Sequence, residues 1–156
     1  MTETLVRTGG LWFEELTPGL AISHPIRRTV TETDNVLFST LTMNPQPLHL
    51  DEQFAAQSEF GTRVVNGLFT LSLVIGLSVT DISLGTTIAN LGYEVVEMPA
   101  PVFPGDTIRV TSTVLDARES RSRPTQGIVR LEHRGYNQRD ELVSRVVRAA
   151  LFRKRP

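Results

Sequence analysis

The chain has no cysteine, so no disulfide can support its fold and no thiolate can serve as a nucleophile or metal ligand. It has almost no net charge, since 16 basic residues face 17 acidic ones, which argues against nucleic acid as the main partner. Long apolar runs are also missing. The longest, 68–79, is interrupted by Thr70, Ser72, Gly76 and Ser78 and falls short of the ~20 residues that cross a bilayer. Residues 1–7 hold no apolar segment of signal-peptide length, so we expect a cytoplasmic protein with no membrane partner.

What is present suits one globular domain. A length of 156 residues with 40% hydrophobic and 21% charged residues fits a single domain over 1–156, with a core from about 10 to 152. Alternating or β-branched patterns predict strands at 21–31, 86–98, 107–115, 127–136 and 142–152, with a polar loop at 116–126. Short helical patterns cover 33–41, with Thr33 or Asp34 as N-cap, and 51–57.

A long apolar helix is predicted at 68–82. Its apolar residues are spread around nearly the whole circumference, which is typical of a helix that is buried on all sides. In a domain of this size the simplest cover for such a helix is a sheet wrapped around it. The order of elements therefore predicts an α+β fold, with an antiparallel sheet around one central helix.

The densest polar cluster is Met43–Asp51, which holds two prolines, two side-chain amides, a histidine and a carboxylate between two helical patterns. The prolines must end the preceding helix. Histidine is the side chain best suited to proton transfer near neutral pH, so His49 is a candidate acid or base. On its residues alone, a loop histidine is more often structural or solvated, and Asp51 more often caps a helix than orients an imidazole.

Three segments together resemble the MaoC-like enoyl-CoA hydratases and dehydratases. The first is 44–51 with Phe54-Ala55, the second is 60–67, which leads into the long helix, and the third is Pro101-Val-Phe-Pro-Gly-Asp-Thr-Ile108. The resemblance covers roughly 10–152 and implies a hot-dog fold, a curved antiparallel sheet rolled around one long helix. The Thr42–His49 run and Glu119-Ser-Arg-Ser-Arg-Pro124 look most like proteins that act on itaconyl-CoA, mesaconyl-CoA or methylmalyl-CoA.

The chain departs from the family pattern at two places. The usual motif reads Asp-x-Asn-Pro-(Ile/Leu)-His; aligned on His49, its Asp position falls on Asn44 and its Asn position on Gln46. The usual His-Gly before the helix is here Asn66-Gly67. The catalytic histidine is therefore present, and the catalytic aspartate is not.

The resemblance implies that hydration of a 2-enoyl thioester is catalysed by His49 as acid/base and by the backbone N–H of Gly67 as oxyanion donor. Read alone, Gly67 is more often a simple helix cap. An amide at Asn44 can hold a water but cannot take its proton. Three routes stay open: His49 makes both proton transfers, a carboxylate such as Asp34 or one on the substrate replaces the missing acid, or the protein binds acyl-CoA without hydrating it.

Substrate contacts are expected from several further side chains: Gln46, Asp51, Arg63, Asn66, Arg121 and Arg123. The arginines suit carboxylate or phosphate groups, because guanidinium pairs with both bidentately. A solvated loop is an equally good reading of 118–123. His24 and His133 fall in strand patterns and are read as ordinary residues.

The sequence thus predicts a hydro-lyase acting on a small, branched dicarboxylic acyl-CoA. We expect no metal and no cofactor apart from the CoA of the substrate, and hot-dog resemblance implies a homodimer. A thioesterase on the same fold is the first alternative, although 60–76 offers no carboxylate for it. A non-catalytic acyl-CoA-binding protein is the second, because of Asn44.

Overall fold

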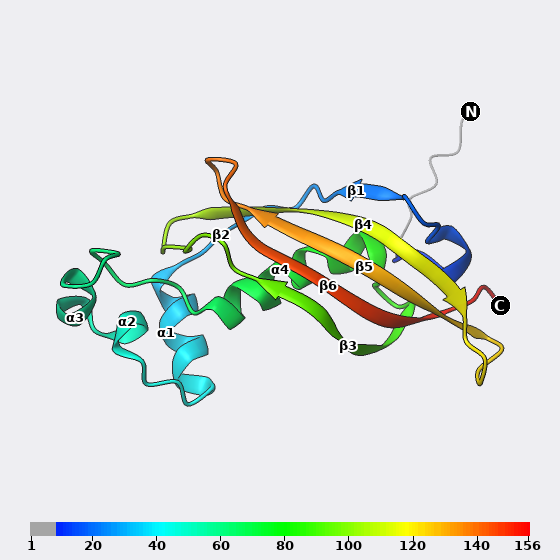
Figure 1. The fold of residues 1–156 in the computed structure, drawn as a ribbon, viewed down its shortest axis with the longest axis horizontal. Coiled ribbons are helices and arrows are strands. Elements are labelled where there is room, and N and C mark those ends of the chain that lie inside the picture. The colour runs from blue at the N-terminus through cyan, green and yellow to red at the C-terminus, as the bar shows by residue number, and fades with distance from the viewer. Residues whose placement is uncertain (1–8) are drawn as a thin grey trace.

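The computed structural model describes residues 9–156 as one antiparallel sheet and one long helix (Figure 1). The predicted lack of a signal segment concerns residues that lie outside this range. The elements follow in the order η1 (Phe13–Glu15), β1 (Ala21–Ser23), β2 (Arg28–Thr29), α1 (Glu32–Leu41), α2 (Pro47–Leu50), α3 (Glu52–Ala56), α4 (Gly67–Ile82), β3 (Thr87–Glu97), β4 (Thr107–Glu119), β5 (Gln126–Tyr136) and β6 (Leu142–Arg153). No helix within residues 9–156 is both long and apolar enough to span a membrane.

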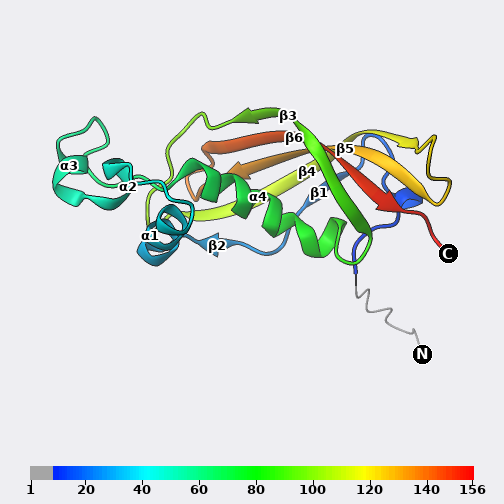
Figure 2. The ribbon, with the colours of Figure 1, turned by 90° about the horizontal axis from the view of Figure 1, so that it is seen from below.

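The sheet has the strand order β1-β4-β5-β6-β3, with β2 also paired to β4. Helix α4 runs along its concave face and contacts β4, β5 and β6 (Figure 2). This is the α+β hot-dog arrangement that the sequence predicts. Alternation in β4 and β5 turns every second side chain toward the helix, as expected from the period of two in a strand.

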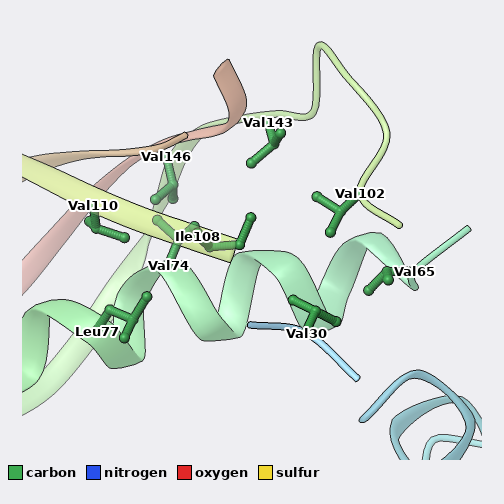
Figure 3. Packing of buried hydrophobic residues seen from close by; sticks show 9 residues of the cluster. All are labelled: Val30, Val65, Val74, Leu77, Val102, Ile108, Val110, Val143 and Val146. Carbon is green, nitrogen blue, oxygen red and sulfur yellow. The ribbon is translucent and has the colours of Figure 1, made fainter. Parts of the chain in front are cut away.

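The core between α4 and the sheet contains two apolar clusters. The larger is at the N-terminal half of α4 (Figure 3) and comprises Val30, Val65, Val74, Leu77, Val102, Ile108, Val110, Val143 and Val146. The other is at the C-terminal half and comprises Leu16, Ile82, Val114, Val129, Leu131, Ala150 and Phe152. Burial of these side chains is the main favourable term that holds the helix in the sheet.

Helix α4 is not buried on all sides, contrary to the sequence prediction. Leu68 is 57% exposed, and Ser72, Gly76 and Thr80 are also exposed. The reason is geometric: the sheet of this chain covers one side of the helix. Strand β3 forms the uncovered edge beside it, where Leu91 and Tyr93 are about half exposed.

Helix α1 begins earlier than predicted. Thr31 is its N-cap, and the Asp34 carboxylate accepts hydrogen bonds from the backbone N–H and the hydroxyl of Thr31, so neither Thr33 nor Asp34 is the cap. The face that the helix buries is polar. Asn35 and Ser39 are fully buried, whereas Leu37 is 53% and Leu41 is 74% exposed.

Smaller differences concern element ends. Pro25 divides the predicted strand 21–31 into β1 and β2, as its missing N–H explains. The predicted loop 116–126 is shorter, because β4 and β5 keep pairing out to Glu119 and Gly127. The proline-rich stretch contains a single helical turn, α2, with Pro47 at its first position, and Asp51 caps α3 by accepting from the Phe54 N–H.

Candidate active site

A pocket of about 340 Å³ opens at the start of α4. Its walls are mainly apolar and come from Phe60, Val64, Val65, Gly67, Thr70, Met98, Pro99, Ala100, Pro101, Val102 and Val143. Val102 and Val143 lie over the first turns of the helix (Figure 3). No carboxylate and no cation is among these lining residues. The pocket therefore suits a small apolar group beside a polar backbone.

The polar feature of this pocket is the backbone at Gly67, the first residue of α4. The flanking amides are occupied: the Asn66 N–H donates to the Asn35 Oδ1 at 2.9 Å, and the Leu68 N–H donates to the Asn66 Oδ1 at 3.0 Å. Within residues 9–156 the Gly67 N–H makes no hydrogen bond. An unpaired amide at a helix N-terminus, where the dipole favours negative charge, is suited to binding an oxyanion.

Glycine at this position leaves room for Met98. A Cβ here would clash with the Sδ of Met98, near the flexible end of a side chain that packs against the Gly67 backbone. Any larger residue would push Met98 aside and narrow the pocket. The sequence prediction that Gly67 sits at the start of the buried helix is confirmed.

His49 lies in α2 and is partly buried. Its Nδ1 is 2.9 Å from the carbonyl oxygen of Val64, a residue that lines the pocket. A carbonyl can only accept, so Nδ1 carries the proton in the neutral ring and Nε2 has the free lone pair. The geometry fixes the tautomer that a general base needs, with its second nitrogen left without a partner among the described residues.

Asn44 and Gln46 have local roles in the turn between α1 and α2. The Asn44 Oδ1 accepts from the Gln46 N–H at 3.1 Å, and the Asn44 N–H donates to the Ser39 carbonyl at 2.9 Å. Met43, just before them, has φ 56°, a left-handed conformation that tightens the turn. Asn44 is partly buried, and the Gln46 side chain is exposed.

Asp34, the candidate replacement for the missing acid, is held by other groups. Burial alone would raise the pKa of its carboxyl, but hydrogen bonds from Arg28 and Thr31 outweigh that effect and lower the pKa. Arg28 Nη2 lies 2.7 Å from Asp34 Oδ1. A carboxylate stabilised in its charged form is a weak base.

The predicted arginines do not gather at the pocket. Arg63 is held between Glu32 and Glu52, at 2.8 and 2.9 Å. Arg121 and Arg123 are exposed in the β4–β5 hairpin, which lies at the opposite end of the molecule from α1–α3 (Figure 1). Asn66 is buried and caps α4, so its amide is not directed at a substrate. Within one chain, the structure links His49 through Val64 to the pocket that Gly67 lines, and it places none of the three arginines among the lining residues.

Asn35, which hydrogen-bonds to His49, and its neighbour Ser39 are buried polar residues that the sequence prediction missed. Both are fully buried on α1, and both accept hydrogen bonds from Asn66. The Asn66 backbone N–H donates to the Asn35 Oδ1, and the Asn66 Nδ2 donates to the Ser39 Oγ at 3.3 Å. Their spacing of four positions places them on one helix face. In the sequence, two polar residues four positions apart among apolar neighbours were the signal that could have indicated a buried polar face.

A second buried polar cluster spans the core near the C-terminal half of α4. It joins Asp81 to His24 at 2.8 Å, His24 to Ser112 at 2.8 Å, Ser112 to His133 at 2.6 Å and His133 to Arg148 at 3.0 Å. Arg148 Nε–H donates to His133 Nε2, so His133 Nδ1–H donates to Ser112 Oγ, whose hydroxyl donates to His24 Nε2, and His24 Nδ1–H donates to Asp81.

Each nitrogen of both rings in this cluster is therefore used. Burial lowers the pKa of His133 to about 3, and the positive charge of Arg148 acts in the same direction. Burial also lowers the pKa of the Arg148 guanidinium. None of His24, Ser112, His133 and Arg148 lines the pocket at Gly67. The sequence prediction that His24 and His133 are ordinary residues understates their bonding, but they are not at the candidate site.

Comparison with known proteins identifies the family. Residues 14–137 match the MaoC-like domain. The chain is 38% identical to the mesaconyl-CoA hydratase of Cereibacter sphaeroides, over 94% of this chain and 42% of that protein. It is 36% identical to the beta-methylmalyl-CoA dehydratase of Chloroflexus aurantiacus, over 94% and 41%. The chain thus spans about two-fifths of the length of these relatives.

Solved structures agree. The MaoC-like dehydratase of Rhodospirillum rubrum is 34% identical and superposes with a TM-score of 0.83, over 94% of this chain and 99% of that one. A double hot-dog protein of Mycobacterium tuberculosis, 22% identical, shares the fold with a TM-score of 0.84 over 97% of this chain and 46% of that one. With this fold, and with the His49 and Gly67 geometry at the start of its central helix, the chain belongs to the MaoC-like domain family.

Proposed function

We propose that this chain is a hydro-lyase that adds water to, or removes it from, the 2,3 double bond of a small branched acyl-CoA. The observation that carries the proposal is the unpaired N–H at Gly67, which lies in a pocket lined by Val64, the residue whose carbonyl holds the His49 ring. The names of the two relatives, a mesaconyl-CoA hydratase and a beta-methylmalyl-CoA dehydratase, support branched C4–C5 acyl groups as substrates.

The chemistry follows from where charge develops. When water adds at C3 of a 2-enoyl thioester, negative charge moves to the thioester oxygen as an enolate. A thioester oxygen placed at the Gly67 N–H would be stabilised by that amide and by the α4 dipole, in a pocket with few other polar groups. His49 Nε2 would accept a proton from the attacking water and then return it to C2.

Because Asn44 stands where the family has an aspartate, both proton transfers fall to His49 in this proposal. An amide can orient the water but cannot accept its proton, and Asp34 is tied to Arg28. We rank the use of His49 for both steps first, help from a substrate carboxylate second, and binding without turnover third. A dicarboxylic substrate fits the second route, because its own carboxylate would be near the reacting carbons.

The apolar pocket also bears on the acyl group. Since no cation is among its lining residues, it would hold the branched carbon skeleton, and a distal carboxylate would have to find its partner elsewhere. Arg63 could take that role only by giving up part of its pairing with Glu32 or Glu52. Asp51 and Gln46 are exposed next to His49, where they are proposed to contact the polar end of the substrate.

A second copy of the chain completes the proposal. Strand β3 is a sheet edge, and the large apolar side chains Ile88, Leu91, Tyr93, Val96 and Met98 are 37–51% exposed there. Covering this edge by β3 of another copy would bury them and remove an unpaired strand edge. Arg121 and Arg123, remote from His49 in their own chain, could meet CoA phosphates only at the site of such a partner.

The proposal is tested by incubating the protein with itaconyl-CoA, mesaconyl-CoA and crotonyl-CoA. We expect the enoyl absorbance to fall with the two branched dicarboxylic thioesters faster than with crotonyl-CoA, without release of free CoA. Thiol release would indicate a thioesterase instead. Saturable binding with no change in any thioester would indicate a non-catalytic acyl-CoA-binding protein. The His49→Ala variant is the matched control for each reaction.

A further inference from the structure

Within residues 9–156, Asn35 is the side chain that hydrogen-bonds to the backbone of His49, of Val64 and of Asn66. Its Nδ2 donates to the carbonyl oxygens of His49 and Val64, each at 3.1 Å, and its Oδ1 accepts from the Asn66 N–H at 2.9 Å. The residue is fully buried, and its partners lie 14, 29 and 31 positions away along the chain. A buried amide with all these groups satisfied is a rigid junction.

The contact with Val64 also determines the state of His49. The Val64 carbonyl receives two hydrogen bonds, one from Asn35 Nδ2 and one from His49 Nδ1, which fill both of its lone pairs. The same amide holds the His49 backbone through its carbonyl. The Asn35 side chain therefore holds both the ring and the backbone of His49, the proposed base.

The contact with Asn66 determines which amide remains free. Because Asn35 Oδ1 occupies the Asn66 N–H, and the Asn66 side chain occupies the Leu68 N–H, only Gly67 of these three presents a free donor. Asn35 thus acts on the proposed base and on the proposed oxyanion donor at the same time.

We propose that Asn35 is a positioning residue that sets the separation and orientation of His49 Nε2 and the Gly67 N–H for the water-addition step. The inference rests on the proposed function, since it concerns the same site. Reaction rates fall steeply when reacting groups shift by about 1 Å, roughly 100-fold in such cases. A residue that fixes both groups is expected to affect the rate of the chemical step more than substrate binding.

The test compares Asn35→Asp with Ser39→Ala. Aspartate has the shape of asparagine but lacks the two N–H donors, so the carbonyls of His49 and Val64 would face an oxygen. Ser39 is equally buried on the same helix face and contacts Asn66, but it makes no contact with His49 or Val64. We expect kcat to fall about 100-fold in Asn35→Asp, with KM within threefold, and about threefold or less in Ser39→Ala.

The tautomer of His49 gives a readout that a merely structural role would not move. Without the two donors of Asn35, the Val64 carbonyl and the His49 backbone are no longer held in one arrangement, so the Nδ1–H of His49 loses its fixed acceptor. The tautomer is expected to change in Asn35→Asp and in Asn35→Ala, and to stay in place in Ser39→Ala. Asn35→Ala serves in place of Asn35→Asp if the latter does not fold.

Nitrogen NMR of ¹⁵N-histidine-labelled protein separates this inference from the proposed function, because it needs no turnover. We expect His49 to be the Nδ1–H tautomer in the wild type and a mixture of tautomers in the Asn35 variants. Wild-type protein that shows this tautomer but hydrates no thioester would contradict the function and leave the positioning intact. Equal losses of kcat in Asn35→Asp and Ser39→Ala, with unchanged His49 signals, would overturn the inference.

Discussion

The two ends of α4 carry two buried polar clusters of opposite character. At the N-terminal end, Asn35 links His49 to Asn66, which in turn bonds Ser39. One nitrogen of the His49 ring and the Gly67 N–H have no partners among the described residues. Toward the C-terminal end, the second cluster runs from Asp81 through His24, Ser112 and His133 to Arg148. There, every nitrogen of both histidine rings is occupied.

The difference shows that a buried row of titratable groups is not in itself a site. The C-terminal cluster has an Asp–His–Ser order that nucleophilic catalysis also uses, but Ser112 is 2% exposed and its oxygen is already shared by two rings. The N-terminal cluster has fewer titratable groups, yet its unpaired donor faces a pocket. Hydrogen-bond donors or acceptors that lack a partner and face a cavity distinguish a candidate site from a structural network.

The largest effects are expected when His49 and His24 are each replaced by alanine and the two variants are compared. His49→Ala should lower kcat about 1,000-fold, because it removes the proposed acid/base, while the free energy of unfolding changes little. His24→Ala should do the reverse: it leaves the Ser112 O–H without its acceptor and the Asp81 carboxylate without its donor, and it should cost about 2–3 kcal/mol of stability, with kcat within threefold. Urea unfolding and initial rates on the same preparations measure both.

The contrast between the clusters would fail if His24→Ala, still folded, lost as much activity as His49→Ala. The C-terminal cluster would then belong to the chemistry. Unchanged activity in His49→Ala would instead remove the acid/base assignment itself.

Acid should destabilise the C-terminal cluster over a defined pH range. His133 is neutral when folded, with a pKa of about 3, but takes up a proton near pH 6.5 when unfolded. Because the unfolded state binds the additional proton, stability is full above pH 6.5 and falls as the pH drops toward 3. Between pH 7.5 and 4.5 the free energy of unfolding should decrease by about 2–3 kcal/mol from this residue.

Urea titrations at several pH values measure this loss. Carboxylates such as Glu132, whose pKa burial would raise but hydrogen bonds lower, begin to lose their own stabilising effect toward the acid end of this window, so a variant is needed to isolate the histidine. His133→Gln, which keeps a donor and an acceptor but does not titrate, should flatten the dependence. A dependence that remains equally steep in His133→Gln would assign it to another group.

The sequence could predict the fold but only part of the site. Alternation at Ile108 and Val110 reports the period of a strand with one buried face, so the sheet is a local property of the sequence. The orientation of α1 is not. Apolar periodicity predicts Leu37 and Leu41 inside, yet the buried residues are Asn35 and Ser39, because their hydrogen bonds compensate for the loss of water.

The hydrogen-bond partners of Asn35 explain why this part of the site could not be predicted from the sequence. The carbonyls and amides that Asn35 binds lie 14 to 31 residues away in sequence and come together only when α1, α2 and α4 pack. The ion pairs of Arg63 could not be predicted for a related reason, since Glu32 and Glu52 meet it from two separate helices. His49 and Gly67 were found through family resemblance, and their geometry then gave each a physical reason.

The smallest effect is expected at Asn44, where the N-terminal cluster departs from its family pattern. Asn44→Asp should keep the hydrogen bond from the Gln46 N–H, because either side chain offers the same Oδ1 acceptor, so the turn should remain intact. A carboxylate next to the bound water would add a second base. We therefore expect kcat to stay the same or to rise by up to about tenfold, and a new acid limb to appear in its pH profile. A decrease of kcat in a variant of unchanged stability would mean that the amide itself does something a carboxylate cannot, such as donating through its N–H₂ to the thioester or to a substrate carboxylate.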